Sequence, residues 1–174
     1  MNTLLSVLLG IGLSAACGFR IFVPFLLVGI AAKTGHVTLG TSFAWMASTP
    51  ALIALAVATV VEIGAYYIPW LDHLLDVVAT PAAVVAGMIM TASVVTGLDP
   101  MLKWTLALIA GGGIAGTVQA LTVGTRKVSL LTTRGLTNPL VSSVECSGSV
   151  LLMVLATALP LLGFAVIAWA LFIG

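Results

Sequence analysis

Apolar segments separated by short polar or proline-containing stretches make up almost the whole chain. A helix that crosses a bilayer needs roughly 20 apolar residues, so 174 residues have room for about six crossings. Two segments begin with a polar residue followed by proline, Thr49-Pro50 and Asn138-Pro139, as helices often do. We expect an all-α bundle of about six spans, at 3–32, 49–68, 81–96, 101–123, 138–158 and 161–173.

The first segment is longer than one crossing requires. We expect it to break near Cys17-Gly18-Phe19-Arg20, or at Pro24, because proline removes a backbone donor and clashes with the preceding turn. Residues 70–80 place acidic and histidine side chains among leucines, which predicts a short amphipathic helix at the membrane interface.

The basic residues predict an orientation. Arg126, Lys127 and Arg134 fall in an expected loop at 124–137, which the positive-inside rule assigns to the cytoplasm. Counting spans from this loop puts both termini in the cytoplasm. Lys33 and Lys103 then lie outside, at some cost to the rule.

The chain reads as one domain, 1–174, with two comparable halves, 1–97 and 98–174. The second helix of each half begins with similar residues and carries one glutamate, Glu62 or Glu145. Three spans per half would give the halves opposite directions, as in inverted-repeat transporters. The alternative is chance similarity between two apolar halves.

Composition excludes several classes of protein. Hydrophobic residues make up 61% of the chain and charged residues 6%, with a mean hydropathy of +1.28, whereas soluble domains carry roughly 25% charged residues. A net charge of +1 without a basic run gives no reason to expect nucleic acid as a partner. We expect the bilayer and a small solute as partners, no cofactor, and a homodimer, because so small a bundle can hardly enclose a solute path alone.

Three charges stand inside apolar segments: Arg20, Glu62 and Glu145. A charge at the bilayer centre costs about 2.5–3.5 kcal/mol, so each must be paired, line water or change protonation. The functional hypothesis is a site that binds an ion or small anion, or relays protons. The alternative is a buried salt bridge that only fixes helix register.

Hydroxyls extend this charged site along one helix. Ser142, Glu145 and Ser149 are spaced to share one helical face, and a polar stripe should face protein or water rather than lipid. The alternative is that the serines bond their own helix or a neighbour, as membrane serines often do.

Two other patterns carry weaker signals. Gly112-x-x-x-Gly116 is typical of close helix packing, within the bundle or in a dimer. Asp72 and Asp76, one turn apart, resemble the magnesium-binding pair of lipid-transfer enzymes, although a solvated interfacial helix explains them as well. We therefore expect no metal site and no enzyme.

Gly12 to Ala32, with its core G-L-S-A-A-C-G-F-R-I-F-V-P-F, resembles a family of small bacterial inner-membrane proteins defined only as a domain of unknown function. Gly18-Phe19-Arg20 and Pro24 form its most distinctive part. The resemblance spans most of the chain and implies an inner-membrane location and six to seven spans, but no activity.

The leading functional hypothesis is a small transporter or channel for an ion or polar solute that uses Arg20, Glu62 and Glu145, with proton coupling as one form of it. The rival is a membrane scaffold or assembly factor in which these charges form structural pairs. A third hypothesis is a magnesium-dependent lipid-modifying enzyme that uses Asp72 and Asp76.

Overall fold

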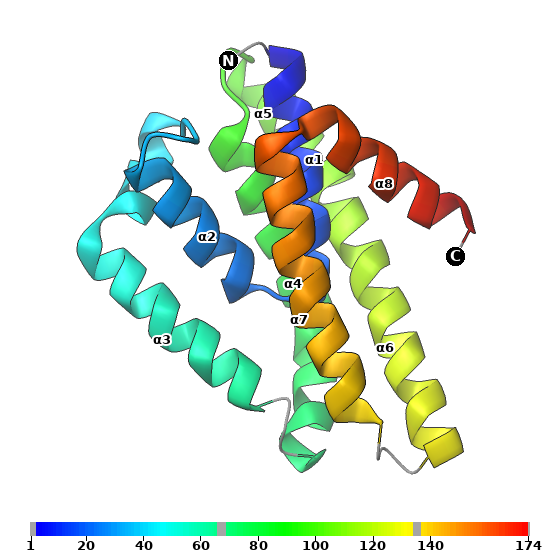
Figure 1. The fold of residues 1–174 in the computed structure, drawn as a ribbon. Helices are drawn as coiled ribbons and strands as arrows, with labels where there is room; N and C mark the ends of the chain where they lie inside the picture. The colour runs from blue at the N-terminus through cyan, green and yellow to red at the C-terminus, as the bar shows by residue number, and fades with distance from the viewer. Residues whose placement is uncertain (1–2, 66–68, 134–136, 174) are drawn as a thin grey trace.

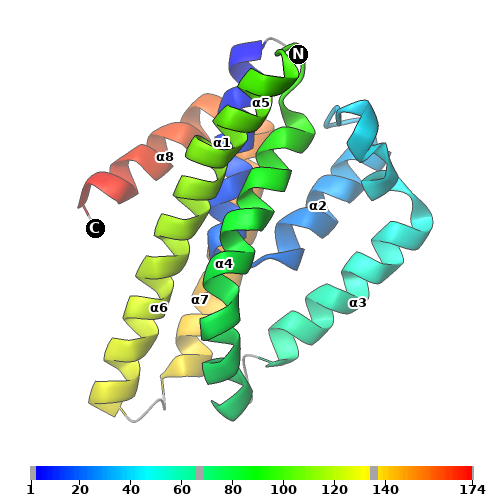
Figure 2. The ribbon, with the colours of Figure 1, turned by 180° about the vertical axis from the view of Figure 1, so that it is seen from behind.

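The computed structural model describes residues 3–65, 69–133 and 137–173. Within these ranges the chain forms helices and turns and no strand, which confirms the all-α prediction. One central helix and the helices around it make up most of the molecule, and two helices with a 3₁₀ segment stand to one side (Figures 1 and 2).

The central helix is α1 (Thr3–Phe19), which packs against α4 (Pro69–Val94), α6 (Gly113–Thr133), α7 (Asn138–Ala158) and α8 (Pro160–Ile173). Small side chains make this position possible, because they let neighbouring backbones come close. Buried small residues along α1 include Gly10, Gly12, Ser14, Ala15 and Gly18.

The chain breaks where the sequence predicted a break. The helix α1 ends at Phe19, and α2 (Phe22–Lys33) begins three residues later. Pro24 lies in the first turn of α2, where a missing N–H leaves no helical bond unmade. The first apolar segment is nevertheless not one crossing, since α2 turns back toward the end of the molecule at which α1 begins (Figures 1 and 2).

The lateral unit consists of α2, the 3₁₀ segment η1 (Thr41–Ala47) and α3 (Thr49–Ala65). The helix α3 packs mainly on α2 and η1, and few of its residues are buried. Its outer face exposes apolar side chains, Ile53, Val57, Val60 and Val61 among them.

The predicted division of residues 70–96 into an interfacial helix and a span is wrong. A single helix, α4, runs through Pro81. Neighbouring helices in a bundle can compensate for the bond that an internal proline removes. The side chains of Asp72, His73 and Asp76 lie outside those that the structure describes.

The predicted loop at 124–137 is also wrong for most of its length. The helices α5 (Pro100–Leu106), η2 (Ala107–Gly112, a π-helix) and α6 form one continuous helix to Thr133. Asp99 caps its start, with a carboxylate oxygen 2.9 Å from the Met101 amide nitrogen. Polar residues at 125–129 suggested a loop, but Arg126 and Ser129 are buried there on the helix.

Glycines allow α4 and the η2–α6 helix to touch. A Cβ on Gly87 would lie 2.5 Å from the Gly111 carbonyl oxygen, closer than real atoms approach. Gly112 and Gly116 face Val84 of the same α4 helix. Their spacing therefore serves packing inside the bundle.

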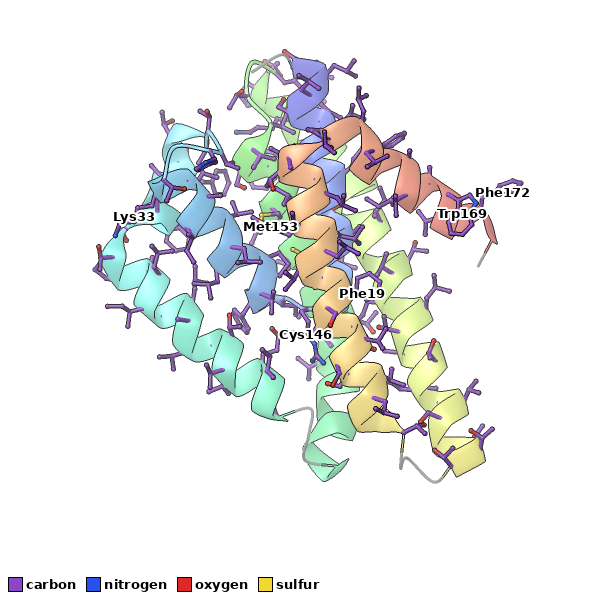
Figure 3. All side chains as sticks on the ribbon, in the orientation of Figure 1. Phe19, Lys33, Cys146, Met153, Trp169 and Phe172 are labelled. Carbon is purple, nitrogen blue, oxygen red and sulfur yellow. The ribbon has the colours of Figure 1, made fainter. Side chains whose placement is uncertain are left out.

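Several surfaces are apolar enough for lipid. Among the described residues, two helices, Pro100–Thr133 and Leu140–Ala158, are long and apolar enough to cross a membrane. A third crossing results if η1 and α3, bent by 66° at Ser48, count as one. Trp169 and Phe172 project from α8 and are 67% and 90% exposed (Figure 3), which is unusual for aromatic residues in water.

Gly87→Ala should destabilise the bundle by about 1–3 kcal/mol, because the added methyl group meets backbone that cannot move aside cheaply. Gly113→Ala is the control, since a Cβ there meets nothing within 4 Å and alanine favours the helix. Thermal unfolding in detergent should show a lower Tm for the first variant alone. Equal Tm values would contradict the close contact.

Candidate functional site

The break between α1 and α2 is held by a glutamate from α3. The Glu62 carboxylate accepts hydrogen bonds from the backbone amides of Ile21, at 2.7 Å, and Phe22, at 3.0 Å. These amides begin α2 and have no partner within that helix, and the helix N-terminus also favours negative charge. Glu62 therefore caps a helix that lies 40 residues earlier in the chain.

Arg20, the residue at the break, points instead toward α7. Its side chain is buried, with 1% of the residue exposed. The Nη2 group donates to the Ser142 carbonyl oxygen at 3.1 Å and to the Ser142 hydroxyl, and it lies 3.5 Å from Glu145 Oε2. The break is thus tied to α7 by charge-assisted hydrogen bonds.

A second arginine binds the same carboxylate. Arg126 of α6 donates from Nε to Glu145 Oε1 at 3.0 Å and from Nη2 to Oε2, which is the two-pronged geometry that arginine makes with carboxylates. Arg126 and Glu145 are 4% and 3% exposed. Glu145 therefore lies between two guanidinium groups, one from the α1–α2 break and one from α6.

Sequence reasoning missed Arg126 because it placed the residue in a cytoplasmic loop. One signal could have found it. Thr122, Arg126 and Ser129 are spaced as residues on one helical face. All three are buried, which fits a helix whose polar side faces its neighbours.

The serines of α7 also serve the break. The Ser149 hydroxyl donates to the Ala16 carbonyl oxygen at 3.0 Å, in the last turn of α1. The same oxygen accepts from the Arg20 backbone amide at 3.1 Å. Ser142, Glu145 and Ser149 thus share one buried face, as their spacing predicted.

The structure therefore brings five of the predicted site residues to one place. Arg20, Glu62, Glu145, Ser142 and Ser149 all contact the α1–α2 break or a residue bound to it. Phe19 and Cys146, the chain neighbours of Arg20 and Glu145, lie at a similar level in the bundle (Figure 3).

The other predicted residues lie elsewhere or outside the described part. Gly112 and Gly116 are on the α4 contact, and the side chains of Asp72 and Asp76 are not among those described. In the part of the chain that the structure covers, no three His, Cys, Asp or Glu side chains are grouped to hold a metal ion.

Chemically, the cluster around the break contains two kinds of carboxylate. Glu145 is buried and bound by two guanidinium groups, so its charge is compensated in place. Glu62 is half-buried and bound by two backbone amides, which carry partial charge only. Movement of the side chain therefore breaks no close ion pair at Glu62, whereas at Glu145 it separates the carboxylate from two arginines.

Comparison with known proteins identifies a family. The family model described as "Domain of unknown function (DUF4126)" matches residues 7–174, which is nearly the whole chain. The chain belongs to the DUF4126 family. This confirms the resemblance seen in the sequence. No curated protein and no solved structure matches the chain.

Arg126→Leu should destabilise this DUF4126 protein by about 2–3 kcal/mol, because the buried Glu145 loses its two-pronged hydrogen bonds and keeps only Arg20 as an ionic partner. Lys127→Leu is the matched control, since Lys127 is the exposed neighbour and surface changes usually stay within about 0.5 kcal/mol. Chemical denaturation in mild detergent measures both. Equal loss in the two variants would argue against the Arg126–Glu145 pair.

Proposed function

We propose that the protein is a small membrane transporter or channel that moves an ion or small polar solute, with the α1–α2 break as its site. One observation carries the proposal: a helix is interrupted inside the bundle, and charged side chains from three other helices gather at the interruption. Transporters commonly build their sites from such discontinuous helices near the bilayer midplane.

The residues at the break would have separate roles. Glu62 would be the group that takes up or releases a proton, because its bonds to the Ile21 and Phe22 amides can open without breaking an ion pair. Arg20 would bind an anion at the break or balance the charge of a glutamate there. Glu145, bound by two arginines, would anchor the site, and the Ser142 and Ser149 hydroxyls would flank the path.

The rival function is a membrane scaffold or assembly factor. The observation that favours it is the Arg20–Glu145–Arg126 network, which is less than 5% exposed at every member and needs no ligand to balance Glu145. Burial of paired charges can fix how helices pack. In this reading the cluster has a structural role and no solute passes.

We also propose a topology. The helices α3, α4, α5–η2–α6 and α7 would cross the bilayer of a bacterial inner membrane, and α1–α2 would enter and leave on one side. The earlier orientation counted residues 3–32 as one crossing, so a hairpin there moves the N-terminus to the side opposite the end of α6. With two crossings in each half, both halves would begin on the same side of the membrane, so this topology does not give the inverted arrangement that three spans per half predicted. A homodimer stays a prediction.

In proteoliposomes, Glu62→Gln should abolish proton-coupled solute flux, because an amide cannot cycle between charged and neutral forms. The variant should remain folded, with a Tm within a few degrees of the parent protein, since about one hydrogen bond is lost. The measurement is pH-dependent flux of candidate ions and small solutes, together with thermal unfolding.

Asp99→Asn is the control, because Asp99 is an exposed helix cap far along the chain from the break and should leave flux intact. The scaffold predicts a different outcome, with no flux in the parent protein under any gradient and a clear loss of stability in Glu62→Gln. That result would overturn the transport proposal.

The hairpin predicts which positions share a membrane side. Thr3→Cys and His36→Cys should react with an impermeant maleimide from one side, and Thr132→Cys from the other, because α1–α2 returns to the end at which it starts. All three positions are exposed, and the native Cys17 is buried. The experiment starts from a Cys146→Ser variant, so that the second native cysteine does not react. Reaction of Thr3→Cys and His36→Cys from opposite sides would contradict the hairpin.

A further inference from the structure

A cavity of about 360 Å³ lies between α1, α6, α7 and α8, one helical turn from the ion network. Phe19 forms its wall on α1, next to Arg20, and Gly148 forms its wall on α7, three residues after Glu145. The helix α8 slants away from α6, so the two are not in contact along most of their length (Figure 1).

The lining is apolar almost throughout. Leucine, valine, isoleucine and alanine make up most of the wall, with two threonines. Both threonine hydroxyls donate within their own helix, Thr122 to the Gln119 carbonyl at 2.9 Å and Thr125 to the Leu121 carbonyl at 3.0 Å. Water needs two to four polar partners to be stable in a cavity, and these walls offer very few.

The cavity opens on the apolar outer surface. Leu121, Leu151 and Val166 line it and are themselves 45%, 59% and 38% exposed, so the opening faces whatever surrounds the bundle. In a bilayer that surrounding is hydrocarbon, which gains contacts with the wall that an empty cavity would lose.

Size limits the occupant. One turn of a helix about 10 Å wide and 5.4 Å long fills roughly 400 Å³, which is more than the cavity holds. A helix from a second copy or from another protein therefore cannot lie inside it and could only place side chains there. An extended hydrocarbon chain is narrow enough and has the matching chemistry.

We propose that this cavity is a binding site for one acyl chain of a bilayer lipid, seated against Phe19 and Gly148. The bound chain fills the space between the end of α1 and the helices α6, α7 and α8, and so stabilises the break at Arg20. This inference rests on the membrane location alone and holds whether or not the protein transports a solute.

Gly148→Leu should close the site. A Cβ on Gly148 would lie 3.9 Å from the Phe19 ring and meets nothing nearer, so a leucine side chain can enter the cavity without moving the backbone. Gly113→Leu is the matched control, because it adds the same side chain to an exposed helix position with nothing within 4 Å.

The probe is phosphatidylglycerol with a diazirine on one acyl chain, at low molar ratio in detergent micelles, followed by peptide mapping. We expect saturable labelling of 148–152 and 166–171 in the parent protein and in Gly113→Leu, and its loss in Gly148→Leu. Labelling of these residues no stronger than on the exposed face of α3, and unchanged in Gly148→Leu, would mean an adventitious lipid only and overturn the proposal.

Thermal unfolding gives a second readout. Added phosphatidylglycerol should raise the Tm of the delipidated parent protein, because a ligand that binds the folded state stabilises it. Gly148→Leu should show a smaller rise than Gly113→Leu, since its leucine already occupies the site. An equal rise in both variants would also overturn the proposal.

Discussion

The fold depends on satisfying the backbone groups that the break between α1 and α2 leaves without helical partners. In an interior without water, an amide or carbonyl group without a partner costs several kcal/mol. Here the partners of the amides come from a distant part of the chain, since Glu62 of α3 binds the first amides of α2. Ser149 of α7 adds a second hydrogen bond to the Ala16 carbonyl at the end of α1, which already accepts from the Arg20 amide. The break is therefore stable only when α3 and α7 are in these positions.

Close packing is what places those partners within reach, since hydrogen bonds act over about 3 Å. Small residues bring the helices around α1 near enough: a Cβ on Gly18 would lie 2.7 Å from the Ala115 carbonyl oxygen, and Thr91 of α4 donates to the Gly10 carbonyl at 3.1 Å. The polar residues can therefore bind the break only because the glycines around it let the helices come close. Larger side chains in place of the glycines of α1 would hold the helices apart and leave the backbone groups at the break without partners.

Much of this could be predicted from the sequence, because an ion in an apolar segment is costly enough to demand a partner. That argument identified Arg20, Glu62 and Glu145, and proline and glycine signals located the break. It could not find that α2 reverses direction, because hydrophobic periodicity gives the face of a helix and says nothing of its path. It also missed Arg126, because a helix whose buried face is polar has a composition close to that of a loop, and the partner that keeps Arg126 buried, Glu145, lies on another helix.

The two glutamates show why equal sequence signals need not mean equal roles. Both were identified by the same cost of burial, yet Glu145 is bound by two arginines and Glu62 by two amides. Movement of Glu145 away from this place would leave two buried guanidinium groups facing each other, so the network holds its side chain in position. A neutral Glu62 carboxyl group could still accept hydrogen bonds from its two backbone amides. In the proposed transport cycle, Glu62 is therefore the carboxylate suited to change its state. Glu145 holds the helices in place during that change.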